Sequence, residues 1–210
     1  MALETHIRIL LGALTNASIP EAPDPHVIRT FEQRFTDARE VDRLLKGSTT
    51  FQNGDRSALQ SIRNLRVQIA MEPASNIAIA VSRVEERSLR LIFSTVHSFG
   101  LPEWRPDLIG GTPTSLYNGA LESIALWTFE QAATSFAYTH LSPNLRYIQD
   151  TALIQKLYRN FVWSYLRGLV LREQKEQGSV SRALQENKAY KSWSEVRKAK
   201  LSIPKLYSDY

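Results

Sequence analysis

The 210-residue chain contains no cysteine, and this absence excludes disulfide bonds, thiolate metal sites and cysteine nucleophiles. The sequence also has no apolar run near the roughly 20 residues that a membrane-spanning helix needs. Histidine is scarce: the four histidines, at positions 6, 26, 97 and 140, lack the i, i+3 or i+4 spacing that places two metal ligands on one helical face. The sequence therefore predicts no metal centre and no cofactor.

Motifs of the common enzyme classes are missing as well. The sequence has no nucleophile elbow, phosphate-binding P-loop or dinucleotide fingerprint. Gly110-Gly111-Thr112 would offer backbone N–H groups to a phosphate at a helix start, but it lacks a following lysine and fits a simple turn equally well. Glu122 and Glu130 lie in a strongly apolar stretch without a visible partner. The sequence therefore predicts no catalytic residue and a protein that is not an enzyme.

Helical periodicity is the dominant signal, with proline and glycine between the periodic segments. It predicts an all-α bundle of about seven helices, over residues 3–16, 25–46, 57–72, 76–99, 115–141, 151–178 and 181–200. Expected N-caps are Asp24, Ser75 or Asn76, Thr112 or Thr114, and Asp150 or Thr151, and Gly47 is an expected left-handed C-cap.

The domain organisation follows from the same pattern. Residues 115–141 are apolar or small almost all round, which is typical of the central helix of a bundle. Residues 100–114 contain three prolines and three glycines, which makes residues 101–114 a constrained loop between an N-terminal helical half, 1–100, and a C-terminal helical half, 115–178. Residues 179–210 are expected to form a basic helix and an extended C-terminal arm.

The positive charge of the chain is concentrated at its C-terminal end. Residues 151–210 hold 12 of the 26 Lys and Arg but only 5 of the 21 Asp and Glu, a net charge of +7, and the remaining residues carry a net −2. A basic segment on a nearly neutral body favours an anionic partner, with nucleic acid ahead of a membrane. The alternative is a charged helix face that only keeps the protein soluble.

Two rows of basic residues and a basic tail are the candidate nucleic-acid contacts. Arginine pairs with phosphates bidentately, whereas exposed aromatic rings stack on bases. The first row is Arg83, Arg87 and Arg90, for which the alternative is a solvated face paired with Glu86; Arg56, Arg63 and Arg66 form a looser cluster nearby. The second row is Lys156, Arg159, Trp163 and Arg167, and the tail adds Lys188, Lys191, Arg197 and Lys198.

Trp163 stands among the cations of the second row, opposite an apolar face that includes Leu157, Tyr158 and Phe161. An indole ring exposed to water gains stability when its face is covered, and three covers are open: a flanking arginine, a protein surface or a nucleobase. The pattern does not choose between them.

These features predict a non-enzymatic, sequence-tolerant nucleic-acid-binding protein, with RNA or single strands favoured, that self-assembles in the manner of coat proteins and nucleocapsids. Its homo-oligomer would form through the C-terminal arm, with contacts from Trp193, Leu201, Ile203, Leu206 and Tyr207. The expected location is intracellular and cytoplasmic, or a virion, with no membrane partner. The alternative is a helical protein–protein interaction module without nucleic acid.

Overall fold

The computed structural model describes residues 1–47 and 56–201, with side chains up to residue 195. Every regular element in these ranges is a helix, so the predicted all-α class is confirmed for the described part of the chain. The chain divides into two compact units, residues 1–170 and residues 171–210.

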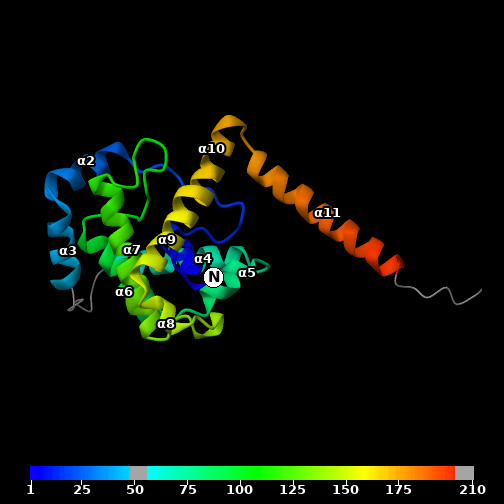
Figure 1. The fold of residues 1–210 in the computed structure, drawn as a ribbon, viewed down its shortest axis with the longest axis horizontal. Coiled ribbons are helices and arrows are strands. Elements are labelled where there is room, and N and C mark those ends of the chain that lie inside the picture. The colour runs from blue at the N-terminus through cyan, green and yellow to red at the C-terminus, as the bar shows by residue number, and fades with distance from the viewer. Residues whose placement is uncertain (48–55, 202–210) are drawn as a thin grey trace, which may run out of the picture. The chain divides into compact units, whose positions relative to one another are not determined.

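The first unit contains most of the helices (Figure 1). In chain order they are α1 (Ala2–Leu11), α2 (Pro25–Arg34), α3 (Ala38–Gly47), α4 (Arg56–Met71), α5 (Asn76–Ser82), α6 (Glu86–Ser98), α7 (Leu116–Thr134), the 3₁₀ turn η1 (Thr139–Leu141), α8 (Leu145–Ile148), α9 (Thr151–Arg159), the π-helical segment η2 (Asn160–Leu166) and the start of α10 (Arg167–Lys175).

Three of the predicted N-caps are confirmed. The Asp24 side chain accepts a hydrogen bond from the His26 backbone N–H, with Pro25 in the first helical position. Ser75 accepts from the Ala78 N–H, and Asp150 accepts from the Leu153 N–H. The cap of α7 is Ser115, not Thr112 or Thr114 as predicted. Short-range capping chemistry therefore positions most of these helix starts.

The predicted helix 25–46 is wrong in its continuity, because two helices, α2 and α3, replace it. Phe35 has an extended backbone, with φ −119° and ψ 126°, and its ring is buried. Asp37 then accepts hydrogen bonds from the backbone N–H groups of Arg39 and Glu40, which opens α3. Gly47 is the last residue of α3 and does not have a left-handed backbone, contrary to the prediction.

The predicted helix 76–99 is also divided, into α5 and α6. The Arg66 guanidinium on α4 donates hydrogen bonds to the carbonyls of Ser82 and Val84, at 3.2 and 3.0 Å. These carbonyls are left without helical partners at the end of α5, and the guanidinium satisfies them there. Val84 is 1% exposed, so its burial also holds the chain in this bend.

Three other predicted helices differ at their C-terminal ends or in their internal geometry. The predicted helix 3–16 ends at Gly12, whose φ of 64° is left-handed. The predicted helix 115–141 ends at Thr134, and Phe136 follows with a left-handed φ of 63°. The predicted helix 151–178 runs only to residue 175, and its middle is the π-helical η2. A π turn holds more residues than an α turn, so it moves Tyr165 to 40% exposure and buries Leu166 completely.

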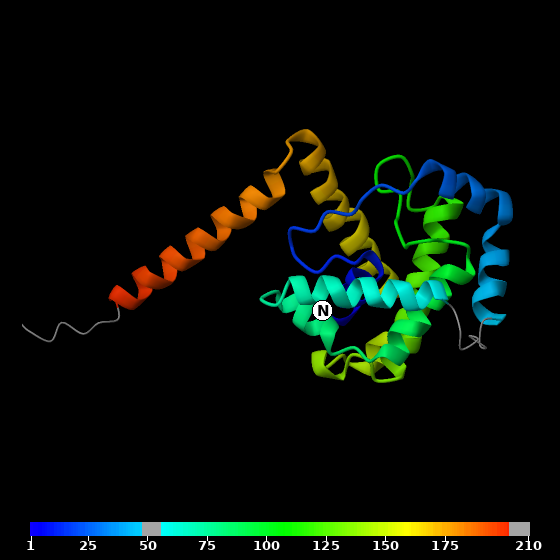
Figure 2. The same ribbon diagram turned by 180° about the vertical axis from the view of Figure 1, so that it is seen from behind.

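Helix α7 packs against α1, α2, α3, α6, α8 and α9. Its side chains at Leu121, Ile124 and Ala125 are 0% exposed. The views from both sides show α4 lying beside α5 and α6 (Figures 1 and 2), in agreement with the packing of these helices. The bundle therefore presents α4, α5 and α6 as one neighbouring group.

A buried polar network joins α1 to α7. His6 is 0% exposed, and its Nε2 lies 2.9 Å from the Thr128 hydroxyl while its Nδ1 lies 2.6 Å from the Tyr138 hydroxyl. The Thr128 hydroxyl donates to the Ile124 carbonyl, so it accepts from His6 Nε2–H, and His6 Nδ1 accepts from Tyr138. Burial lowers the pKa of His6 to about 3, outweighing an opposing hydrogen bond to the Ala125 carbonyl. The imidazole is therefore neutral in the folded protein.

The second unit contains the end of α10 and the long helix α11 (Ser179–Leu201), coloured orange to red in Figure 1. Between them, Gly178 has a left-handed φ of 79°. The Glu173 carboxylate accepts hydrogen bonds from the backbone N–H groups of Gly178 and Val180, at 2.5 and 3.2 Å. One carboxylate therefore closes the turn that starts α11.

Candidate nucleic-acid interface and a polar pocket

The arginines of α4 and of the α5–α6 bend come together in the structure. Because Arg66 binds the carbonyls on both sides of Arg83, the cluster predicted on α4 lies next to the start of the first predicted row. Arg63 is exposed one turn before Arg66 on α4, and Arg83 and Arg87 are exposed at the bend. Within the described residues, no carboxylate pairs with Arg63, Arg83 or Arg87. We call these four arginines the arginine corner.

The first predicted row does not lie on one helix. Arg83 is the C-cap residue of α5, whereas Arg87 and Arg90 belong to α6. Arg90 forms an ion pair with Glu86 at 2.6 Å, and this is the intrahelical partner that the alternative interpretation named. Both side chains are about half exposed, so the pair contributes little stability. It does remove much of the net charge that Arg90 would offer to a phosphate.

The second predicted row is largely engaged within the protein. The Glu122 carboxylate on α7 is 6% exposed and accepts hydrogen bonds from Arg159, with Nη2 at 3.1 Å, and from the Gln155 amide at 2.6 Å. Arg167 donates to the Leu108 carbonyl at 2.9 Å. Lys156 is exposed and has no ion-pair partner among the described residues. Of the three cations of this row, Arg159 is therefore the one whose charge a carboxylate offsets, whereas the partner of Arg167 is a neutral carbonyl.

Trp163 lies within η2 and is half-buried. Its neighbours Phe161 and Val162 are buried, and Phe161 stacks on Tyr165 with ring centroids 5.4 Å apart. The π-helical geometry changes the angular spacing between the residues of the row, which was predicted for a regular α-helix. The three alternatives for the group that covers the Trp163 ring, a flanking arginine, a protein surface or a nucleobase, stay predictions.

The basic tail belongs to the second unit. Lys188 and Lys191 are exposed on α11, and Tyr190 and Trp193 are 69% and 61% exposed. Arg197, Lys198 and Leu201 lie in α11 beyond the described side chains. Ile203, Leu206 and Tyr207 lie outside the described residues. The described part of α11 thus carries cations and aromatic rings together at its surface.

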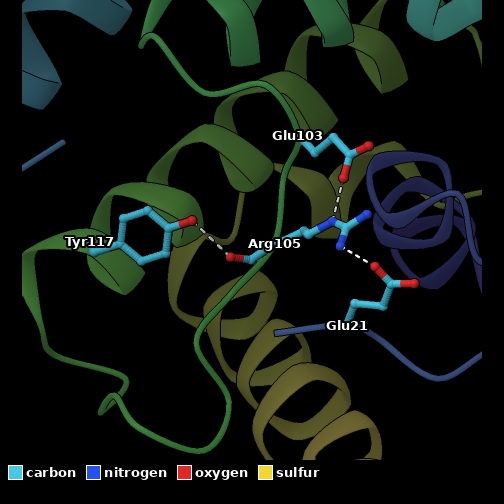
Figure 3. A network of polar contacts seen from close by, with 4 residues as sticks. All are labelled: Glu21, Glu103, Arg105 and Tyr117. Carbon is cyan, nitrogen blue, oxygen red and sulfur yellow. Dashed lines mark hydrogen bonds and ion pairs between the residues drawn. The ribbon is translucent and has the colours of Figure 1, made fainter. Parts of the chain in front are cut away.

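The loop before α7 is anchored by a polar network (Figure 3). Arg105 lies between the carboxylates of Glu21 and Glu103 and pairs with both. Its backbone carbonyl accepts a hydrogen bond from the Tyr117 hydroxyl at 2.9 Å. Partial burial lowers the pKa of Arg105, but the hydrogen bond to Glu21 and the charges of Glu103 and Glu21 outweigh it and raise that pKa. This guanidinium is a structural cation.

The phosphate interpretation of Gly110-Gly111-Thr112 loses its main support. The Gly110 backbone N–H donates to the Asp107 carboxylate at 2.8 Å, so an acid of the chain already occupies that donor. A Cβ at Gly111 would lie 2.5 Å from the Asn118 amide nitrogen. The Asn118 amide binds the Asp107 and Thr112 carbonyls, and the glycine allows this close approach. The run is a turn that fits against α7.

A polar pocket of about 140 Å³ lies between α1, α4 and α6, with Arg105 in its wall. It is lined by Ser61 and His97, whose side chains are hydrogen-bonded at 3.0 Å. No sequence motif indicated this pair, because the two residues lie 36 positions apart and meet only when α4 packs on α6.

A larger apolar groove, of about 410 Å³, lies between the N-terminal end of α1 and the α9–η2 segment. It is lined by Met1, Leu3, Glu4, Leu157, Asn160, Phe161 and Tyr165. Leu157 is 45% exposed, although its spacing predicted it for the buried face. The Arg8 guanidinium lies 5.4 Å from the centre of the ring of Phe161, one of the side chains that line the groove.

Comparison with protein-family models, with curated proteins and with solved structures finds no match to this chain. Within the described residues, none of the helices combines the length and the apolar character that crossing a lipid bilayer requires.

Proposed function

We propose that the exposed basic residues of this protein have a non-enzymatic role: they bind nucleic acid, with RNA or single strands favoured and with tolerance of any base sequence. The observation that carries the proposal is the pair of Arg66 hydrogen bonds to Ser82 and Val84, which brings two separate arginine clusters into one corner. Arg63, Arg83 and Arg87 are exposed there, and guanidinium groups pair with phosphate oxygens bidentately.

Charge and aromatic exposure on α11 support the same proposal. Lys188 and Lys191 offer salt-sensitive attraction to phosphates, whereas Tyr190 and Trp193 offer rings on which bases stack without sequence preference. The proposal gives little weight to Arg90, Arg159 and Arg167, because each has a partner within the chain.

The proposal is tested by neutralising one arginine of the corner. Arg87→Gln is expected to weaken binding to a labelled, mixed-sequence single-stranded oligonucleotide about threefold to tenfold at 50 mM salt, because one phosphate contact is lost. The double variant Arg83→Glu/Arg87→Glu is expected to weaken it by more than about tenfold and to flatten the salt dependence. Fluorescence anisotropy at 50 and 200 mM salt measures both effects.

Arg90→Gln is the matched control, because it changes the net charge by the same amount but removes an arginine that is already paired with Glu86. Its affinity should stay within about twofold of the wild type. The proposal is abandoned if the wild type does not bind the oligonucleotide at 50 mM salt, or if Arg87→Gln and Arg90→Gln weaken binding equally.

A second candidate function is a self-associating interaction module, and the apolar groove favours it. We propose that the groove takes the aromatic side chains Tyr190 and Trp193 from α11 of a second copy. Lys188 and Lys191 flank these rings, and Glu4, which pairs with the N-terminal ammonium of Met1 at 3.9 Å, is the acidic side chain at the otherwise mostly apolar groove. Exposed aromatic anchors that enter an apolar groove are typical hot spots of such interfaces.

Leu157→Glu is expected to weaken this self-association at least tenfold, because it places a carboxylate in the groove beside Glu4. Light scattering coupled to size-exclusion chromatography, over a range of protein concentrations, measures the change. Leu145→Glu is the control, since Leu145 is 43% exposed on α8, outside the groove. A wild type that stays monomeric at the highest concentration, or a Leu157→Glu variant that assembles like the wild type, contradicts the groove assignment.

A further inference from the structure

The polar pocket holds a serine and a histidine in the arrangement that nucleophilic catalysis uses. The His97 Nδ1 lies 2.9 Å from the Leu101 carbonyl oxygen, and His97 Nε2 lies 3.0 Å from the Ser61 hydroxyl. A carbonyl oxygen only accepts hydrogen bonds, so Nδ1 carries the proton of the neutral ring. Nε2 is then unprotonated, and the Ser61 hydroxyl donates to it.

This tautomer is the one that a general base needs. In a serine–histidine pair, the histidine nitrogen facing the hydroxyl must be free to take its proton, and a third group must hold the other nitrogen. The Leu101 carbonyl fills that third position here. Ser61 has no other hydrogen-bond partner among the described residues, so its hydroxyl is committed to His97 alone.

Two amide side chains complete the pocket. Asn64 and Gln68 follow Ser61 at spacings of three and seven, which places all three on one face of α4, and all three line the pocket. Asn64 accepts from Gln60 through its oxygen. Within the described residues, no partner binds the Asn64 amide nitrogen or the Gln68 side chain. Amide N–H groups next to a nucleophile can stabilise the negative charge that develops on an attacked carbonyl oxygen.

The small volume of the pocket and the exposure of its edge limit the size of the group that can bind inside it. The pocket volume of about 140 Å³ suits a short acyl group, and Asn64, Gln68 and Glu103 at its edge are exposed. A larger alcohol portion can therefore remain in solvent. We infer that Ser61 is a nucleophile for acyl transfer from small esters, with His97 as its general base. This inference is independent of nucleic-acid binding and concerns a different surface from the arginine corner.

The reaction balances without a metal or a redox partner. Ser61 Oγ forms a bond to the ester carbonyl carbon while its proton moves to His97 Nε2. The tetrahedral intermediate then breaks its bond to the alcohol oxygen, which takes the proton from His97. Water attacks the resulting acyl-serine ester in the same way, giving a carboxylic acid and restoring the Ser61 hydroxyl.

A fluorophosphonate probe tests the nucleophile, since the serine oxygen displaces fluoride from phosphorus and leaves a covalent adduct. Intact-mass and peptide mass spectrometry are expected to find one adduct, on Ser61. The labelling rate should fall at least tenfold in His97→Gln and the adduct should be absent from Ser61→Ala. Ser82→Ala, which removes an exposed hydroxyl elsewhere, is expected to label like the wild type. No adduct on Ser61, or labelling that does not depend on His97, overturns the inference.

A thiol variant gives a second readout that does not depend on the probe. Because the chain has no cysteine, the Ser61→Cys variant has a single thiol, and the cysteine side chain is similar in size to the serine that it replaces. If His97 acts as a base, alkylation by iodoacetamide should stay fast well below pH 8.5, the ordinary pKa of a cysteine. In the double variant Ser61→Cys/His97→Gln, the alkylation rate should instead rise with a midpoint near pH 8.5. Identical pH profiles with and without His97, in variants whose helical circular dichroism matches the wild type, reject the role of His97.

Discussion

Replacing Arg159 by methionine is expected to lower the free energy of unfolding by about 2–3 kcal/mol. The Glu122 carboxylate is almost fully buried on α7, and Arg159 is its charged partner, so the variant leaves a buried charge with only the Gln155 amide. Breaking a fully buried pair costs about 3–5 kcal/mol. The Arg159 side chain is 47% exposed, and solvent screening reduces the expected cost accordingly. Urea denaturation at pH 7.5 measures the loss.

Lys156→Met is the matched control for this experiment. Lys156 is exposed on the same helix and has no ion-pair partner in the described chain, so its replacement should change stability by less than about 0.5 kcal/mol. The comparison also separates two roles for Arg159. An Arg159→Met protein that is as stable as the Lys156→Met protein but binds oligonucleotide more weakly would make Arg159 a phosphate contact instead of the partner of Glu122.

The second large effect is a loss of stability in mild acid that depends on His6. Burial holds the pKa of His6 at about 3 in the folded protein, against 6.5 for an ordinary histidine. Between these values the unfolded chain binds a proton that the folded chain does not, so the stability is complete above pH 6.5 and is lost as the pH falls toward 3. The slope approaches about 1.4 kcal/mol per pH unit in the middle of this window.

His6→Phe removes the titrating group while keeping a ring beside Phe129 and Tyr138, at the positions where the imidazole makes edge contacts. The variant should be less stable at pH 7.5, because the Tyr138 hydroxyl loses its acceptor. Its stability should, however, fall less steeply from pH 6.5 to 5. His26→Gln, at an exposed position on α2, should retain the wild-type slope. Parallel pH dependences for His6→Phe and the wild type would contradict the linkage.

The sequence predicted the elements that depend on nearby residues. Asp24, Ser75 and Asp150 were identifiable as caps because each acts on a backbone N–H two or three positions away. The bend between α5 and α6 was not predictable in this way. It depends on Arg66, which lies 16 positions before Ser82 and reaches its carbonyl only in the packed bundle.

The candidate sites were less accessible to sequence analysis for the same reason. Ser61 and His97 have no shared motif, and Glu122 looked unpartnered because Arg159 is 37 positions away. Exposed cations can be found in a sequence by spacing, but their partners come from other helices. Spacing along the sequence pointed to the members of the arginine corner, Arg83 and Arg87 in one group and Arg63 and Arg66 in the other, but not to the contact that joins the two groups.

The π-helical stretch of η2, from Asn160 to Leu166, has a consequence for the tolerance of this chain to length changes. Such a stretch is equivalent to an ordinary helix carrying one surplus amino acid, and removing that surplus would let the hydrogen bonding revert to the regular repeat. Because the wide turn absorbs the surplus residue, the helix on either side of the deletion would keep nearly the same facing, whereas the same deletion in a regular α-helix would turn everything after it by about 100° around the axis. Arg167 would still face the Leu108 carbonyl, so a one-codon deletion within η2 is expected to be tolerated better than a one-codon deletion within α9.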